Sequence, residues 1–375
     1  EYDEAGRVRY EGDFAAGLYD GEGSLYDEGV LVYEGKFSEG LYDGKGKLYE
    51  NGELRYEGAF AAGTYQGEGT LYSEGMPQDK GGVANGLYQG AGKRYENGVL
   101  AYEGEFSAGL EQGSGTAYAE GALLYKGAFS EGQWDGEGTE FFPDGTVRYK
   151  GGFSEGEYSG EGTLYFASGQ LQYKGQFAQG KYDQQGRLYQ EDGSCLYEGG
   201  FLLGEYDGEG TLYLAEQTAF SGTFSKGAPT GEVRLTRGGL LRYAGQVEGL
   251  LPEGRGTLYD GGGAAVYSGQ MTDGGADLGT LLGKSAQEVR EAFGEAALTE
   301  VSGGAKGFSI VNSALGATVF CSYKTEKSEP IAYYAYRYET GADAFCGALQ
   351  WNNAEEFEAQ AAPGYEKKET TEKAS

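Results

Sequence analysis

Apolar and polar residues alternate along most of this chain in short runs. The segment 31–37 reads LVYEGKF, which places Tyr33 and Phe37 on one side of a strand and Glu34 and Lys36 on the other. A period of two with apolar residues on one side is typical of a half-buried β-strand. A second alternating run follows about ten residues later, so the pattern predicts pairs of neighbouring strands.

Turn residues separate these runs and predict tight hairpins. Asn51-Gly52 supplies the positive backbone angles that a two-residue turn needs. Ser38-Glu39-Gly40 turns the chain at the other end of the same strand. Equivalent turns are expected at Asn97-Gly98, Asp144-Gly145, Ser168-Gly169 and Asp192-Gly193. Each unit is therefore predicted to be one hairpin of an up-and-down meander.

The hairpin unit repeats with a fixed period. Glycines recur at steps of 23 or 24 residues, at Gly12, Gly35, Gly58, Gly81, Gly104, Gly127, Gly151, Gly175, Gly199, Gly222, Gly245 and Gly269. Such a period marks an array in which each unit buries its face only by stacking on the next. The fold class predicted for residues 1–273 is mainly β, an elongated single-sheet meander of about 12 hairpin units.

Aromatic residues flank these strand glycines and predict the core. Glycine inside a strand packs nothing by itself, but it leaves room for an aromatic ring to lie across the backbone. We define the spine tyrosines as Tyr10, Tyr33, Tyr56, Tyr102, Tyr125, Tyr149, Tyr173 and Tyr197. Their partners are Phe14, Phe37, Phe60, Phe106, Phe129, Phe153, Phe177 and Phe201. The expected result is an aromatic spine along one face.

The unit resembles a known repeat family. The pattern Tyr-x-Gly-x-Phe-x-x-Gly-x-Tyr-x-Gly-x-Gly-x-Leu-Tyr resembles the membrane occupation and recognition nexus (MORN) repeat, here over residues 1 to about 273. The resemblance implies a non-catalytic array that mediates attachment and assembly, of the type found in bacteria. Departures occur at Asp79 and Val83, which replace the aromatic residues around Gly81, and at the last two units.

The repeat pattern stops after Met271, and a different pattern follows. Ser285 and Glu288 fit a capping box, which predicts a helix that ends near Gly294. Strand-like runs at 307–311, 318–323 and 331–338 complete a small α+β domain over 278–345. This piece is similar to small bacterial envelope modules of the outer-membrane-assembly lipoprotein and β-lactamase-inhibitor-protein type. Residues 346–375 are predicted to be a mostly disordered polar tail.

Composition excludes several classes of function. The net charge of −30 disfavours nucleic acid and direct binding to anionic membranes. The chain has no His, which removes histidine-based nucleophile systems and metal sites, and an enzyme is not expected. Cys321 and Cys346 could form a disulfide, but a buried free thiol is the preferred interpretation of each cysteine. No segment approaches 18 consecutive apolar residues.

Two motifs suggest ligands that their context does not support. Gly-x-Gly triplets such as Gly21–Gly23 would need a following helix to bind a nucleotide, whereas here strands flank them. Calcium loops need several carboxylates at alternate positions, and Glu22, Glu68 and Glu137 stand singly. The sequence therefore predicts no cofactor and no metal site.

One repeated aromatic position remains as a candidate for binding. It precedes the Gly-x-Gly triplet and is expected at the turn, where its rings could contact a protein or a sugar. The alternative is that these rings stack within the array. We call this set the stacking row: Tyr19, Tyr42, Tyr65, Tyr88, Trp134, Tyr158, Tyr182 and Tyr206.

Three functions are weighed against one another. A protein-binding scaffold fits a long array without catalytic groups. A cell-wall or carbohydrate-binding repeat protein is the alternative, although such arrays rely on Trp, and this chain has only Trp134 and Trp351. A membrane-lipid-binding array is less favoured because of the net charge. Cell surface or envelope is favoured over cytoplasm, with the true N-terminus outside the sequence shown.

Overall fold

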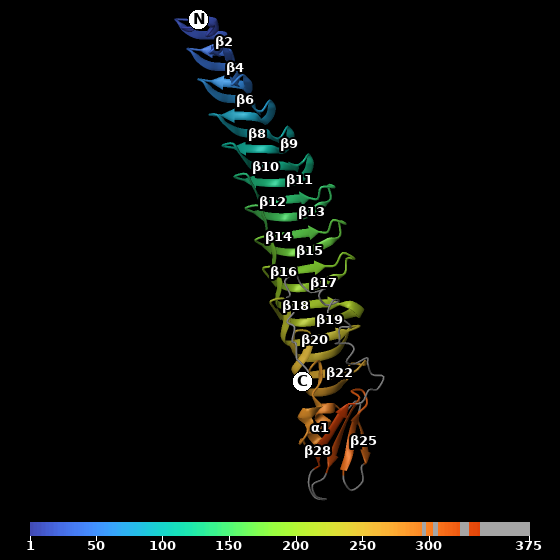
Figure 1. Cartoon of the computed structure of the whole chain (residues 1–375). Coiled ribbons are helices and arrows are strands. Elements are labelled where there is room, and N and C mark those ends of the chain that lie inside the picture. The colour runs from blue at the N-terminus through green and yellow to red at the C-terminus, as the bar shows by residue number, and fades with distance from the viewer. Residues whose placement is uncertain (295–297, 303–306, 323–329, 338–375) are drawn as a thin grey trace. The chain divides into compact units, whose positions relative to one another are not determined.

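The structure is a computed structural model that describes residues 1–294, 298–302, 307–322 and 330–337 (Figure 1). Its contacts divide the chain into two units, Glu1–Leu171 and Gln172–Ser375, and each is described by itself. The proposed domain boundary near residue 273 is not a boundary of these units, and it stays a prediction. The expected disordered tail at 346–375 lies outside the described residues.

The first unit is a run of antiparallel strands, and each strand pairs with the next one along the chain. In Figure 1 they follow one another in chain order. The strands are β1 (Tyr10–Ala15), β2 (Leu18–Asp27), β3 (Val30–Ser38), β4 (Leu41–Glu50), β5 (Glu53–Ala61), β6 (Thr64–Ser73), β7 (Met76–Ala84), β8 (Leu87–Glu96), β9 (Val99–Ser107), β10 (Leu110–Ala119), β11 (Ala122–Ser130), β12 (Gln133–Phe141), β13 (Val147–Ser154) and β14 (Glu157–Tyr165).

The second unit is also an antiparallel meander, and it ends in a small α+β region. Its array strands are β15 (Leu171–Ala178), β16 (Lys181–Tyr189), β17 (Cys195–Leu202), β18 (Glu205–Leu214), β19 (Thr218–Ser225), β20 (Ala228–Arg237), β21 (Leu240–Glu248), β22 (Leu251–Tyr259), β23 (Ala265–Thr272) and β24 (Gly275–Ala276). The 3-10 turn η1 (Ala215–Gln217) interrupts them. The C-terminal elements are η2 (Leu278–Leu281), α1 (Ala286–Phe293), β25 (Leu298–Ser302), β26 (Gly307–Asn312), β27 (Ala317–Ser322) and β28 (Ile331–Arg337). The predicted fold class, a mainly β hairpin meander followed by a small α+β region, is confirmed.

The turns explain why the period is sometimes 23 and sometimes 24 residues. Asn51 and Gly52 both have positive φ, at 54° and 82°, as the primed hairpin turn requires. The loop between β12 and β13 is longer, and only Gly145 in it has a positive φ. The N–H of Phe142 donates to the carbonyl oxygen of Thr146 at 2.8 Å and closes this loop. The additional residue of a 24-residue step therefore lies in the hairpin loop. The prediction that Asp144-Gly145, Ser168-Gly169 and Asp192-Gly193 are equivalent to Asn51-Gly52 is wrong for this reason.

The spine tyrosines form the core, and the strand glycines make room for them. Tyr33 is fully buried, and its hydroxyl donates to the carbonyl oxygen of Lys36 at 2.9 Å. A Cβ atom added to Gly46, on the partner strand, would lie 2.2 Å from the Tyr33 hydroxyl oxygen. The predicted aromatic cover of the glycines is therefore present. Phe14, on the first strand, differs from the other spine phenylalanines because 51% of its surface is exposed.

The C-terminal elements pack on the last repeat. Ser285 and Glu288 form the predicted capping box of α1, and Val289 and Phe293 are buried. The side-chain amide of Asn312, which is fully buried on β26, donates to two carbonyl oxygens, one on β23 and one at the end of α1. The three predicted strands are found as β26, β27 and β28, whereas β25 was not predicted.

Candidate partner-binding surface

The residues of the stacking row do not lie at turns, as the sequence analysis expected, but inside strands. Tyr19, Tyr42 and Tyr65 are the second residues of β2, β4 and β6. The remaining members hold the same position in β8, β12, β14, β16 and β18: Tyr88, Trp134, Tyr158, Tyr182 and Tyr206. The backbone of the row also joins neighbouring hairpins, since Gly40 donates its N–H to the carbonyl oxygen of Tyr19 at 2.8 Å.

The rings of the row, apart from Tyr88, stack on the spine tyrosines. The Tyr42 ring lies parallel to the Tyr33 ring, with centroids 3.8 Å apart and an interplanar angle of 12°. Phe37 and Phe60 meet the Tyr42 ring edge-on at 5.6 and 5.7 Å. Trp134 stacks on its spine tyrosine in the same way, with centroids 4.4 Å apart. Stacking within the array, which was the alternative interpretation, therefore accounts for part of the surface of these rings.

Exposure divides the row into two groups. Tyr88 and Tyr206 are core residues, with 8% and 1% of their surface exposed. The other six rings are half-buried: Tyr19, Tyr42, Tyr65, Trp134, Tyr158 and Tyr182. Within the row, only these six can present aromatic surface to a partner, and we call the sheet face that carries them the aromatic face.

The tyrosine hydroxyl groups of the row differ in their partners. Tyr158 donates to the carboxylate of the buried Glu140, which also accepts from Arg148 at 3.0 Å. Burial, and then this hydrogen bond, raise the pKa of Tyr158 above its ordinary value. Among the described residues, the buried Tyr206 hydroxyl has no hydrogen-bond partner, since Leu188 stands where Tyr158 meets Glu140.

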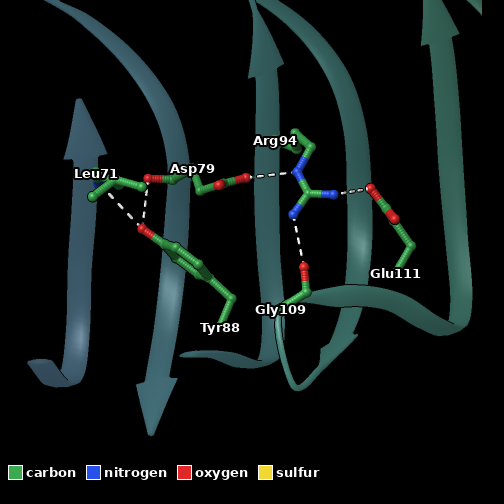
Figure 2. A network of polar contacts seen from close by, with 6 residues as sticks. All are labelled: Leu71, Asp79, Tyr88, Arg94, Gly109 and Glu111. Atoms are coloured by element: carbon green, nitrogen blue, oxygen red, sulfur yellow. Dashed lines mark hydrogen bonds and ion pairs between the residues drawn. The ribbon is translucent and has the colours of Figure 1, made fainter. Parts of the chain in front are cut away.

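The fourth hairpin, formed by β7 and β8, replaces this aromatic packing with charged groups. Figure 2 shows Tyr88, Asp79, Arg94 and Glu111 side by side across neighbouring strands. The Arg94 guanidinium donates to the Asp79 carboxylate at 2.8 Å, to the carbonyl oxygen of Gly109 at 2.8 Å, and to Glu111. Burial alone would lower the pKa of Arg94, but the hydrogen bond to Asp79 and the two carboxylate charges outweigh it and raise the pKa.

The structure also reveals a second tyrosine ladder that the sequence analysis did not single out. It follows the leucine position of the even-numbered strands, at Tyr26, Tyr49, Tyr72, Tyr95, Tyr118, Tyr165, Tyr189, Tyr213 and Tyr259. The Tyr49 hydroxyl donates to Glu34 at 2.8 Å, so the ring lies on the face opposite the spine. Burial, then the Glu34 hydrogen bond, raise the pKa of Tyr49 to about 12. The Leu-Tyr pair at most of these strand ends was the signal, because adjacent strand residues point to opposite faces.

The described part of the chain offers neither a cluster of metal ligands nor a helix suited to span a membrane. No group of three or more His, Cys, Asp or Glu side chains there is arranged to hold a metal ion. No helix among the described residues has the length and apolar character to cross a membrane. Cys321 is buried in β27, while Cys346, the other half of the considered disulfide, lies outside the described residues.

Comparison with known families gives one match. The family model described as MORN repeat matches seven segments: residues 10–28, 33–53, 56–75, 102–121, 125–147, 149–171 and 197–218. The matched segments leave out residues 76–101, which contain Asp79 and Arg94. None of the curated proteins compared with the chain matches it.

Proposed function

Because this chain is a MORN repeat protein, we propose that it is a non-catalytic scaffold whose array binds a protein partner. MORN repeats are commonly scaffold repeats that bind proteins or membranes. The proposed contact surface is the aromatic face, with the six half-buried rings of the stacking row as the binding residues: Tyr19, Tyr42, Tyr65, Trp134, Tyr158 and Tyr182.

The observation that carries this proposal is the partial cover of each ring. Tyr42 and Tyr65 are each covered on one side by a parallel spine tyrosine, at 3.8 and 3.9 Å between centroids, and both remain half-buried. Their ring orientation is fixed by stacking, so binding would cost little further side-chain entropy. Tyr and Trp are enriched at binding hot spots because they bury large area at a small entropy cost.

A protein partner fits this face better than the other two candidates. The net charge of −30 opposes contact with an anionic membrane surface. A carbohydrate partner, the alternative, would also stack on aromatic rings, but Trp134 is the only tryptophan in the stacking row. The absence of His from the whole sequence removes the commonest general base and is consistent with a non-catalytic role.

The test is a selection of binding peptides from a random displayed library against the full chain, with glycan arrays and vesicles assayed in parallel. The selected peptides are then measured against the variant Tyr42→Leu/Tyr65→Leu. The matched control is Tyr49→Leu/Tyr72→Leu, which makes the same changes on the same two strands, β4 and β6, but on the opposite face.

The proposal expects peptides whose affinity falls at least roughly tenfold in the first variant and stays within about twofold in the control, as for loss of hot-spot residues. Melting curves of both variants establish that the array remains folded. Binding of glycans or vesicles without binding of peptides would replace this proposal with the carbohydrate or lipid alternative.

A further inference from the structure

The fourth and fifth hairpins depart from the repeat in four positions, three of which bond to one another. Asp79 stands in place of a spine tyrosine, and Val83 in place of the spine phenylalanine. Arg94 takes the leucine position of β8, and Glu111 takes the stacking-row position of β10. Because Arg94 bonds both Asp79 and Glu111, these replacements form one connected arrangement (Figure 2).

The arrangement holds Tyr88 away from the geometry of the other units. With no spine tyrosine to stack on, Tyr88 donates its hydroxyl to the carbonyl oxygen of Asp79 at 2.8 Å and accepts from the N–H of Leu71 at 3.1 Å. Phe106, from the next hairpin, meets the Tyr88 ring only at a tilt, with centroids 6.0 Å apart. The guanidinium of Arg94 lies over the Phe106 ring at 5.2 Å. Tyr88 is therefore held by hydrogen bonds, whereas Tyr65, in the preceding hairpin, is held by stacking on Tyr56.

A cavity of about 220 Å³ remains where the aromatic side chains are missing. Its apolar lining consists of Tyr56, Tyr65, Tyr88, Leu71, Val83 and Leu87. Asp79, with 6% of its surface exposed, and Arg94 supply polar atoms to the same wall. An aromatic lining with a few placed polar groups is typical of a ligand pocket.

The strand glycines of this hairpin show how the missing spine tyrosine changes the packing. In other units a ring covers them: a Cβ at Gly69 would lie 2.1 Å from the Tyr56 hydroxyl oxygen. Gly81 and Gly92 are retained in the fourth hairpin, although no tyrosine lies over them. The Phe106 ring covers Gly92 instead, since a Cβ there would lie 3.0 Å from it. The missing spine tyrosine is therefore replaced only in part, by a phenylalanine of the next hairpin.

We propose that this cavity is a binding pocket for a tyrosine side chain of the protein partner. The inference rests on the proposed function, and it adds one specific anchor to the aromatic face. The incoming ring packs against Tyr65 and Tyr88, and its hydroxyl exchanges hydrogen bonds with the Asp79 carboxylate and the Arg94 guanidinium. Asp79 and Arg94 already bond each other. A phenol adds a further hydrogen bond to this pair, whereas a purely apolar ring displaces water from it without adding one.

The direct test uses p-cresol, the side-chain analogue of tyrosine, with the full chain. Methyl NMR of Leu71, Val83 and Leu87 follows the titration. We expect saturable shifts confined to these methyl groups, and toluene should bind roughly three- to tenfold more weakly, as for loss of one hydrogen bond. A short peptide that contains Tyr should cause the same shifts, and its Leu counterpart should not.

The pocket is removed by restoring the repeat sequence, in the variant D79Y/V83F/R94L/E111Y. This variant carries residues that other hairpins already use, so it should fold with an unchanged or higher melting temperature. We expect the p-cresol shifts to disappear. The control A117L restores a leucine in the corresponding position of the next hairpin and should leave them unchanged.

The p-cresol experiments test the pocket, whereas the displayed peptides test the aromatic face. Absence of shifts, equal affinity for toluene, or binding of p-cresol without binding of the Tyr peptide would overturn the pocket. Displayed peptides that lose affinity in Tyr42→Leu/Tyr65→Leu would still support the aromatic face in that case. Failure of both experiments would remove both proposals.

Discussion

Substitution of Gly127 by Ala tests the packing on which the array depends. A Cβ at this position would lie 2.3 Å from the hydroxyl oxygen of Tyr125 and 2.6 Å from the Cα atom of Gly138. The first contact requires the ring to move, and the second requires the backbone of the partner strand to move. Both are closer than real Cβ atoms approach, so the site cannot accept even one methyl group without rearrangement.

The expected cost follows from the contacts that are lost. Tyr125 donates to the carbonyl oxygen of Ala128 at 3.0 Å, a bond worth about 0.5–1.5 kcal/mol. Its ring stacks on Trp134, which contributes roughly another 0.5–1.5 kcal/mol. Overpacking against the backbone adds about 1–3 kcal/mol. The substitution should therefore lower the free energy of unfolding by about 2–6 kcal/mol.

Urea unfolding followed by Trp134 fluorescence reports this site directly, with Trp351 replaced by Phe in every protein compared. The matched control is Gly262→Ala, where the nearest atom is the Asp260 carboxylate at 3.4 Å, an ordinary contact. Since Ala restricts the unfolded chain, the control should be neutral or stabilising by up to about 1 kcal/mol. Equal unfolding midpoints for the two variants would refute the interpretation that strand glycines exist to make room for the spine.

Three further predictions concern polar groups. Tyr206→Phe should raise the melting temperature, because it removes a buried hydroxyl that has no hydrogen-bond partner among the described residues. Tyr158→Phe should lower the melting temperature, because it removes a hydrogen bond to the Glu140 carboxylate. Calorimetry should therefore give shifts of opposite sign for the two variants. Burial raises the pKa of Tyr56 to about 12 against about 10 in an unfolded chain. The stability contributed by such tyrosines is complete below pH 10 and is lost as the pH rises toward 12. Phenolate absorbance and far-ultraviolet circular dichroism should therefore change together in that range, and phenolate formation centred near pH 10 with an intact fold would contradict this. Asn312→Ala removes the donor to two buried carbonyl oxygens and should lower the free energy of unfolding by about 1–3 kcal/mol. A change within error in chemical denaturation would show that Asn312 does not join α1 to β23.

The sequence predicted the repeated elements because their causes are local. Alternation identifies a strand, and Asn51-Gly52 identifies its turn, without knowledge of any distant residue. The role of Gly46 could also be predicted, since only an aromatic cover explains a glycine in a buried strand. For the same reason the capping box of α1 was found, as Ser285 and Glu288 are three residues apart.

Features that depend on contacts between hairpins were not predictable in the same way. The exposure of Tyr42 depends on how far Tyr33 and Phe60 surround it, and they lie in three different strands. The replacement of Tyr by Asp79 was visible as a departure, but nothing in the sequence linked it to Arg94 or Glu111, which lie 15 and 32 residues further on. Their connection became evident only from the pairing of the strands.

The most direct test of the account is tyrosine footprinting of the array with and without a bound peptide from the displayed library. Oxidative labelling is measured by mass spectrometry at each ring of β4 and β6. The account predicts that the peptide protects Tyr42 and Tyr65, on the aromatic face, and leaves Tyr49 and Tyr72 labelled as in the free protein. Protection of Tyr49 and Tyr72 with unchanged labelling of Tyr42 and Tyr65 would place the partner on the opposite face and contradict the account.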